Sequence, residues 1–528
     1  MKKTSFVVWL ILVVEFLYIF AFLMNYDFAW VNQEKFGVHQ WILSNGSQWH
    51  KEDWTKFLNI NVIECNPYRL SRPLSNFVEV VDTKFRAWLW NFIPPHPSLS
   101  LQWPFMFILL PWLLYQTFVN MGCYPFMALA GACLYISSPG FLGPLVMLFH
   151  PAKSLANFFG VLSMYFFSIN YKREFSLPKN EEASRQRRGG GVLFIAGLLA
   201  LYLAFISDET GLYMYVVVLL LFFRLWLRSW QEKRYGIFAG LLAMPILYWA
   251  TIKVFLPYLH WAVMGVKINL ASYESYPSLK SLFWPNWHFL WLNTRFLFAD
   301  HPHLLINYKQ LLSHPLILSI QIVYVLLFLW MVFLFFRSAL KNKNDPRQID
   351  FLKLTVIGVL LLLGYCFFQT FQLSKNAKAW GIWWYGSLFS LIYTVALVFF
   401  LQFICSHYQW LRKWSAVIIF IFVLNTMTFT TYRLAICKMQ NLNRTAYSFM
   451  DIFKGRVDPY GFDFDEFFDK SYCRQMYTYM YWLHWKGLPD NIDPRKINKC
   501  FSRYLSSDLY FFTEEDGYLP AELGQPPS

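Results

Sequence analysis

Charged side chains are scarce in this chain. Asp, Glu, Lys and Arg together make up 15% of its 528 residues, whereas hydrophobic residues make up 57%. A soluble globular protein has about a quarter of its residues charged, so the composition excludes an ordinary water-soluble fold. Acidic residues are the rarer kind, and the formal net charge is +15. Because the basic residues stand in short runs between apolar segments, this charge argues against a nucleic-acid partner. It favours anionic membrane lipids or a phosphate-bearing substrate.

Cysteine is also sparse. The 8 cysteines are scattered, none forms a Cys-x-x-Cys pair, and several stand within apolar runs. This pattern argues against a zinc cluster or a disulfide framework. Aromatic residues, by contrast, make up 21% of the chain. Their rings suit the boundary between water and lipid, where one end is wet and the other apolar.

Long apolar runs dominate the sequence. A helix needs about 20 apolar residues to cross a bilayer, because no backbone group can stay unpaired in hydrocarbon. By this rule the sequence predicts an all-α polytopic membrane protein with about 11 transmembrane helices. The third is interrupted by Pro139, Gly140 and Pro144, so it is expected to be bent or split. The expected ranges are 5–24, 103–120, 124–150, 152–170, 192–206, 212–227, 236–256, 316–336, 354–373, 381–403 and 414–431.

The distribution of basic residues predicts the orientation. With the N-terminus placed inside, the inside segments hold most of the Lys and Arg residues. The short outside turns then hold only Lys153, Lys375 and Lys378. An odd number of spans puts the C-terminus outside.

The long segments between spans all fall on the outer side. A transmembrane domain over 1–431 is expected to carry two large outer loops, 25–102 and 257–315, and to be followed by a small outer C-terminal domain over 432–528. Any chemistry on a substrate is therefore expected at the outer face of the membrane that the protein spans. The Lys-rich start favours a multi-pass protein of a bacterial inner membrane, with its active site facing the periplasm.

The first outer loop holds three candidate site residues. Asp27 follows the first span at headgroup depth, where a carboxylate can act as a general base or a metal ligand. Arg69 and Arg72 precede a predicted amphipathic helix that begins at Asn76 with Ser75 as its cap. Two guanidinium groups there can clamp a phosphate or pyrophosphate, or simply contact lipid headgroups.

Two adjacent acids, Asp208 and Glu209, stand in a very short outer turn between apolar helices. Ionisable residues at this depth are costly, so the pair is a functional candidate; a water-facing polar turn is the alternative. Oxygen ligands at a wet boundary suit Mg²⁺ or Mn²⁺, and Asp208 is a candidate ligand.

Two later outer segments offer weaker candidates. His301 and His303 could bind a divalent metal beside Asp300, although the proline between the imidazoles favours an ordinary surface loop. Lys375 and Lys378 flank a short turn next to several tryptophans, and they suit an anionic lipid phosphate or plain interface anchoring.

These features, in this order, resemble the GT-C superfamily of membrane glycosyltransferases. The stretch from Arg72 to Ser75 is similar to the Tyr-Arg-Pro-Leu stretch of the tetratricopeptide-bearing transmembrane O-mannosyltransferases. The stretch from Ser207 to Gly211 is similar to their Ser-Lys-Glu-x-Gly stretch. A long first outer loop and an outer C-terminus match the usual layout of the superfamily.

The resemblance implies an inverting sugar transfer from a polyprenyl-phosphate sugar donor to a glycan, lipid or protein. Asp27 corresponds to the catalytic carboxylate, Glu209 to the acid of the second motif, and Arg72 to the basic residue of the first. Three other functions stay open at this point. They are a transporter of a lipid-linked glycan, a polysaccharide polymerase or ligase, and a non-enzymatic assembly subunit.

Overall fold

The computed structural model describes the helical part of the chain. The described residues are 72–89, 101–138, 140–141, 151–176, 190–208, 210–264, 315–341, 346–373, 386–415, 417–418 and 421–425, with a few isolated positions before residue 93. Most of the first outer loop, most of the second and the whole expected C-terminal domain lie outside these ranges. The expected domain division is therefore still a prediction.

All regular elements in the described ranges are helices, and no strand occurs among them. Four helical segments are long and apolar enough to cross a bilayer: Tyr235–Leu259, Leu318–Leu340, Gln348–Phe368 and Gly386–His407. The all-α, membrane-embedded class is thus confirmed, whereas the number of about 11 spans stays a prediction. The helices run in the order α4 (Pro73–Leu89), η3 (Phe105–Leu109), α5 (Leu110–Asn120), α6 (Pro125–Ile136), α8 (Pro151–Ser176), α10 (Gly190–Ser207), α11 (Thr210–Leu221), α12 (Phe223–Gln231), α13 (Tyr235–Ala250), η4 (Thr251–Phe255), α14 (Leu256–Met264), α18 (Pro315–Lys341), α19 (Pro346–Leu373) and α20 (Gly386–His407).

Two predicted spans are interrupted. The span expected over 212–227 consists of α11 and α12, which bend by 63° at the break between them. Together they would form a fifth span. The third expected span begins with α6, which ends at Ile136, three residues before Pro139. A proline disfavours helical backbone in the residue before it, so a helix end at this point is expected.

The core of the bundle forms around α8, which packs against α5, α10, α11 and α20. Aromatic rings fill the space between these helices. The buried ring of Phe167 on α8 lies edge-on to that of Trp226, with the ring centroids 5.1 Å apart. Small residues allow the closest approaches, as at Gly131, where an added Cβ would lie 2.4 Å from Val398 of α20. Close packing at small residues is typical of helix pairs in membranes.

Polar contacts join neighbouring helices at each of the two ends of the bundle. At one end Glu174, near the end of α8, lies 2.9 Å from Nη1 of Arg234 and 3.3 Å from Nε of Arg228. Arg224 of α12 pairs with Asp350 at the start of α19. We name this the Glu174 end. The start of α8 and the turn between α10 and α11 lie at the other end, named the Arg72 end after the residue that joins them.

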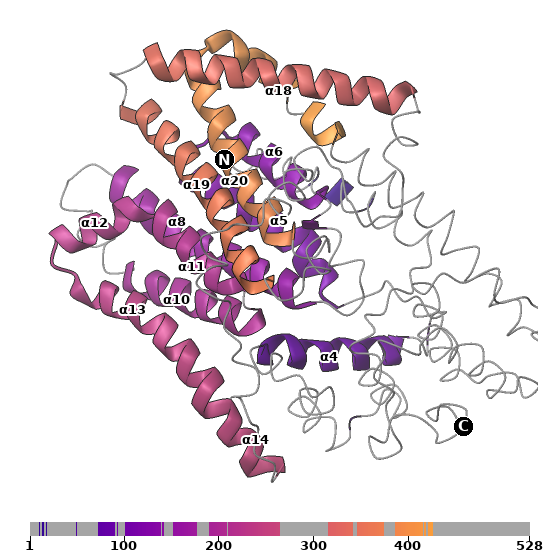
Figure 1. The fold of residues 1–528 in the computed structure, drawn as a ribbon, viewed down its shortest axis with the longest axis vertical. Coiled ribbons are helices and arrows are strands. Elements are labelled where there is room, and N and C mark those ends of the chain that lie inside the picture. Colours follow the sequence, from indigo (N-terminus) through magenta and orange to yellow (C-terminus); the bar gives the residue numbers. More distant parts are fainter. Residues whose placement is uncertain are drawn as a thin grey trace, which may run out of the picture.

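Two helices cross the ends of the bundle (Figure 1). The indigo α4 lies crosswise at one end, against α8 and α10, and α18 runs crosswise at the opposite end. α18 contacts the later part of α20 and the residues after it: Phe335 lies 5.2 Å from the ring of Phe403, and Trp330 lies 5.6 Å from the ring of Trp410, which follows the end of α20.

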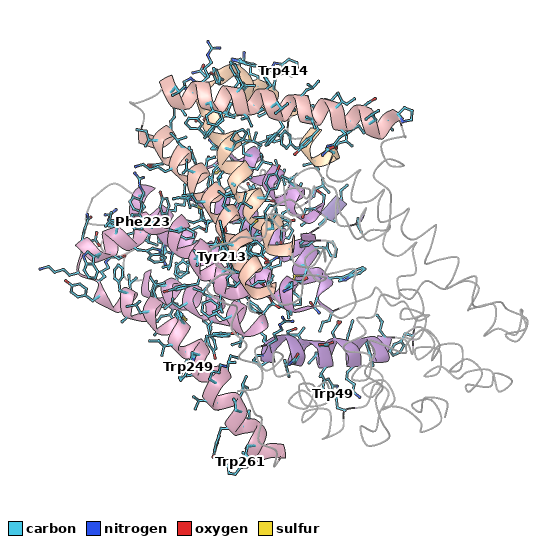
Figure 2. The ribbon with its side chains drawn as sticks, in the orientation of Figure 1. Trp49, Tyr213, Phe223, Trp249, Trp261 and Trp414 are labelled. Carbon is cyan, nitrogen blue, oxygen red and sulfur yellow. The ribbon has the colours of Figure 1, made fainter. Side chains whose placement is uncertain are left out.

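Exposed aromatic residues lie near both ends of the bundle. Figure 2 shows Tyr213 in the middle of the bundle, whereas Trp414 and Trp261 lie at opposite ends of the molecule. Trp414 and Trp261 are exposed, as is Trp249 on α13. Tryptophans at both ends of an apolar bundle match the aromatic belts of membrane proteins.

Candidate anion-binding site

The turn between α10 and α11 fixes the side chain of Asp208. Its Oδ1 accepts hydrogen bonds from the backbone N–H of Thr210 at 2.9 Å and from the Thr210 hydroxyl at 2.7 Å. Aspartate commonly caps a helix in this way, because the first backbone N–H groups of a helix have no partner within it. The backbone of Gly211 lies so close to α10 that an added Cβ would be 2.2 Å from the carbonyl oxygen of Ala204. The turn is therefore tight, and the carboxylate has a fixed position.

Two cations meet this carboxylate. Nε of Arg72, just before α4, lies 3.1 Å from Oδ2 of Asp208. Nζ of Lys153, in the first turn of α8, lies 3.0 Å from Oδ1. The Asp208 side chain is fully buried and that of Lys153 is 4% exposed, whereas that of Arg72 is 19% exposed. The cluster thus joins α4, α8 and the α10–α11 turn, and Arg72 is its most accessible member.

The electrostatics of the cluster keep Asp208 ionised. Burial acts to raise its pKa, but the attraction of Arg72 and Lys153 and the two hydrogen bonds from Thr210 outweigh burial. The pKa of Asp208 is therefore held well below its usual range. A carboxylate with so low a pKa is a poor proton acceptor at neutral pH. Asp208 instead holds two cations in place.

The helix predicted in the first outer loop is confirmed, but two details of the prediction are wrong. It begins at Pro73 rather than at Asn76, so Ser75 lies within the first turn and is not its cap. Proline favours the first helical position, because its fixed φ suits a helix and its missing N–H would have no partner there.

The orientation of α4 also differs from the expectation. An amphipathic helix lying in the membrane interface turns its polar residues to headgroups and water, yet Glu79, Asp82 and Lys84 are buried, whereas Phe77 and Trp88 are exposed. The reason is that α4 lies across the polar helix ends of the bundle rather than on an apolar surface. Oδ1 of Asp82, for example, accepts a hydrogen bond from the backbone N–H of Leu101 at 2.6 Å.

Of the predicted site residues, the structure brings Arg72 and Asp208 together. The other predicted site residues lie outside the described part of the chain, and their roles remain predictions. They are Asp27, Arg69, Glu209, His301, His303, Lys375 and Lys378.

The described part of the site does not fit a divalent cation. Each oxygen of the Asp208 carboxylate already faces a cation, and added positive charge would be repelled. Among the described residues, no group of three or more His, Cys, Asp or Glu side chains could hold a metal ion. The expectation of Mg²⁺ or Mn²⁺ therefore rests on residues beyond the described ranges, and no step below depends on a metal.

Lys153 is the site residue that the sequence analysis missed. It appeared there only as one of the few cations in the outside turns. The usable signal was its place in the first turn of a membrane helix, where an ionisable residue is costly and therefore a functional candidate. Its partner could not be read from the sequence, because Asp208 stands 55 residues further along the chain.

Comparison with known proteins gives no further identification. A scan against protein-family models, a search of curated proteins and a search of solved structures each find no match for this chain.

Proposed function

We propose that this protein is a membrane glycosyltransferase of the GT-C type. It would transfer a sugar from a polyprenyl-phosphate-linked donor to a glycan, lipid or protein acceptor at the Arg72 end. The observation that carries the proposal is the pairing of a guanidinium and an ammonium group on one buried carboxylate, at the end of an apolar helical bundle. A lipid-linked phosphate reaches this depth by lying in the membrane.

The cluster suits the leaving group of such a transfer. As the bond between the anomeric carbon and the phosphate oxygen breaks, negative charge grows on the phosphate. Prepositioned cations stabilise that charge most when they do not have to move. Arg72 is partly accessible and can present its guanidinium fork to phosphate oxygens, while its contact with Asp208 fixes its position. Lys153 adds a second positive charge at the same place.

The acceptor half of the reaction is assigned to residues outside the described ranges. The acceptor hydroxyl would give its proton to the carboxylate of Asp27 and bond to the anomeric carbon from the face opposite the phosphate. The products are then an inverted glycoside and polyprenyl phosphate. Glu209 would support the acceptor, and Arg69, Lys375 and Lys378 would contact the phosphate or neighbouring lipid headgroups.

The proposal also includes the orientation of the protein in the membrane. The Glu174 end carries Arg224, Arg228 and Arg234, so we assign it to the cytoplasmic side of a bacterial inner membrane. The Arg72 end then faces the periplasm, with the N-terminus inside and the C-terminus outside.

The test is transfer in proteoliposomes that contain the full-length protein and a panel of radiolabelled polyprenyl-phosphate hexoses and pentoses. Arg72→Gln is expected to raise the donor KM and lower kcat, and Arg72→Lys to recover part of the loss. Asp27→Asn is expected to lower kcat with little change in donor KM. Arg228→Gln, a charge removal at the Glu174 end, serves as the matched control and keeps the wild-type donor KM.

Two results would count against the proposal. Wild-type transfer rates in Arg72→Gln would remove the cluster from phosphate recognition. Movement of the labelled lipid across the bilayer without any transfer would identify a transporter instead.

A further inference from the structure

A second buried polar cluster lies where α6, α8 and α20 meet. The side-chain amide of Asn157 on α8 donates to the hydroxyl of Tyr135 on α6 at 2.9 Å and to the hydroxyl of Ser387 on α20 at 2.7 Å. All three side chains are almost completely buried, with Tyr135 at 0%, Asn157 at 1% and Ser387 at 2% exposure. We name these residues the Asn157 triad.

The triad has hydrogen-bonding capacity that its own members do not use. The carbonyl oxygen Oδ1 of Asn157 is buried and has no hydrogen-bond partner among the described residues. Turning the amide by 180° exchanges its oxygen and nitrogen and still leaves one polar atom over. Tyr135 and Ser387 both accept from Asn157, and Ser387 also hydrogen-bonds to Tyr135, so one of the two hydroxyl hydrogens is left over. One acceptor and one donor are thus left over within the triad.

Hydrogen bonds between the three helices alone do not account for this arrangement. Polar side chains between membrane helices hold the helices together when their groups satisfy one another. Asn120 and Ser168 show such a bond at the Glu174 end, where the amide of Asn120 donates to the Ser168 hydroxyl at 3.1 Å. The Asn157 triad differs because a buried acceptor is left over, and buried acceptors are normally satisfied.

The triad lies directly inward of the cationic cluster. Asn157 follows Lys153 by four residues on α8, so the two side chains share one face of the helix, about 6 Å apart along its axis. Tyr135 is the next-to-last residue of α6, and Ser387 is the second residue of α20. A molecule whose phosphate contacts Arg72 and Lys153 would bring its next few atoms to the level of the triad.

The chemistry of the spare groups identifies the kind of ligand group. A hydroxyl is both a donor and an acceptor, so it can donate to Oδ1 of Asn157 and accept from Tyr135 or Ser387. A phosphate has no hydrogen to give to Oδ1, and the polyprenyl chain would leave every spare group unsatisfied. We propose that the Asn157 triad binds a hydroxyl group of the sugar on the lipid-linked donor. This inference rests on the proposed function, and it assigns sugar recognition to residues separate from the phosphate contacts.

The test compares two ligands on the same protein preparation. The full-length protein in nanodiscs is titrated with a polyprenyl-phosphate hexose and with the bare polyprenyl phosphate. Asn157→Leu is expected to weaken binding of the glycosylated lipid by about tenfold, the loss of a typical hydrogen bond, and to leave binding of the bare phosphate unchanged. Asn120→Leu, the matched amide at the Glu174 end, is expected to change neither affinity.

Further variants keep the test decisive if Asn157→Leu folds poorly. Tyr135→Phe and Ser387→Ala each remove one hydroxyl and leave the packing nearly intact. Each is expected to lower the ratio of the affinity for the glycosylated lipid to the affinity for the bare polyprenyl phosphate. The ratio does not depend on the fraction of folded protein. Equal weakening of both ligands, or of neither, by all three variants would overturn the inference and leave the triad as the site of a buried water.

A different set of results would contradict the proposed function. Arg72→Gln is expected to weaken both ligands, because both carry the phosphate. If the wild-type protein bound neither lipid, or if Arg72→Gln changed neither affinity, phosphate recognition at the Arg72 end would be wrong. An absence of wild-type binding would overturn the sugar site as well.

Discussion

Nζ of Lys153 lies 3.0 Å from Oδ1 of Asp208, although the two residues stand 55 positions apart in the chain. This contact joins the first turn of α8 to the turn between α10 and α11. Asp208 also holds Arg72 on its other oxygen. One buried carboxylate therefore positions two cations from separate segments, and the function proposed for the Arg72 end depends on this arrangement.

Removing the charge of Asp208 should destabilise the protein strongly. Asp208→Asn removes the negative charge from a buried ion pair with Lys153, and breaking a buried ion pair from one side costs about 3–5 kcal/mol. The free energy of unfolding in detergent micelles measures this loss. Asp350→Asn is the control, because its ion pair with Arg224 is partly exposed and should contribute less than about 1 kcal/mol. Similar losses in both variants would show that Asp208 is not held as described.

The effect of Asp208 on stability should depend on pH in one direction. Its pKa is lower in the folded protein than in the unfolded chain, where an aspartate has a pKa of about 3.9. Lower pH therefore favours the unfolded state through this group, and the stabilisation is complete above about pH 5. The difference in free energy of unfolding between the wild type and Asp208→Asn should be constant from about pH 5 to 8 and should shrink below about pH 4. A difference that grows as the pH falls would mean that the pKa is raised instead.

Close helix approaches predict which glycines cannot be replaced. An added Cβ at Gly140 would lie 2.4 Å from the backbone oxygen of Gly386, and one at Gly211 would lie 2.2 Å from that of Ala204. Gly140→Ala and Gly211→Ala should each lower the melting temperature, because neither backbone can move without repacking its helix.

Gly236→Ala provides the control for the glycine series. This residue lies in the first turn of α13, and an added Cβ there would meet nothing within 4 Å. The change should be neutral or stabilising by up to about 1 kcal/mol, since alanine favours a helix more than glycine does. Equal tolerance at Gly140, Gly211 and Gly236 would contradict the close packing.

The orientation of α4 can be tested by cysteine labelling. Val80 is 1% exposed and Trp88 is 49% exposed. Trp88→Cys should therefore react with a small maleimide in membranes, while Val80→Cys should stay protected until the protein is unfolded. Peptide mapping by mass spectrometry separates these sites from the native cysteines. Rapid labelling at position 80 would show that the polar face of α4 is turned outward after all.

The sequence predicted some residues of the described part of the candidate site and missed others. Arg72 and Asp208 were both candidates, since charged residues beside apolar helices are costly and stand out. The role of Arg72 stays a prediction, whereas Asp208 was expected to bind a metal and its carboxylate instead faces two cations. The Asn157 triad gave no signal, because single Asn, Tyr and Ser residues within apolar runs are common between membrane helices.

Local composition by itself determined the class of this protein. Long apolar runs can satisfy their backbone groups in lipid only as helices, so the membrane-embedded helices and the helix near Arg72 followed from the sequence. The tertiary structure alone decided which charges meet and which face of α4 is buried. A carboxylate attracts any nearby cation equally, and only the packing of helices distant in the chain determined that Arg72 and Lys153 would be its partners.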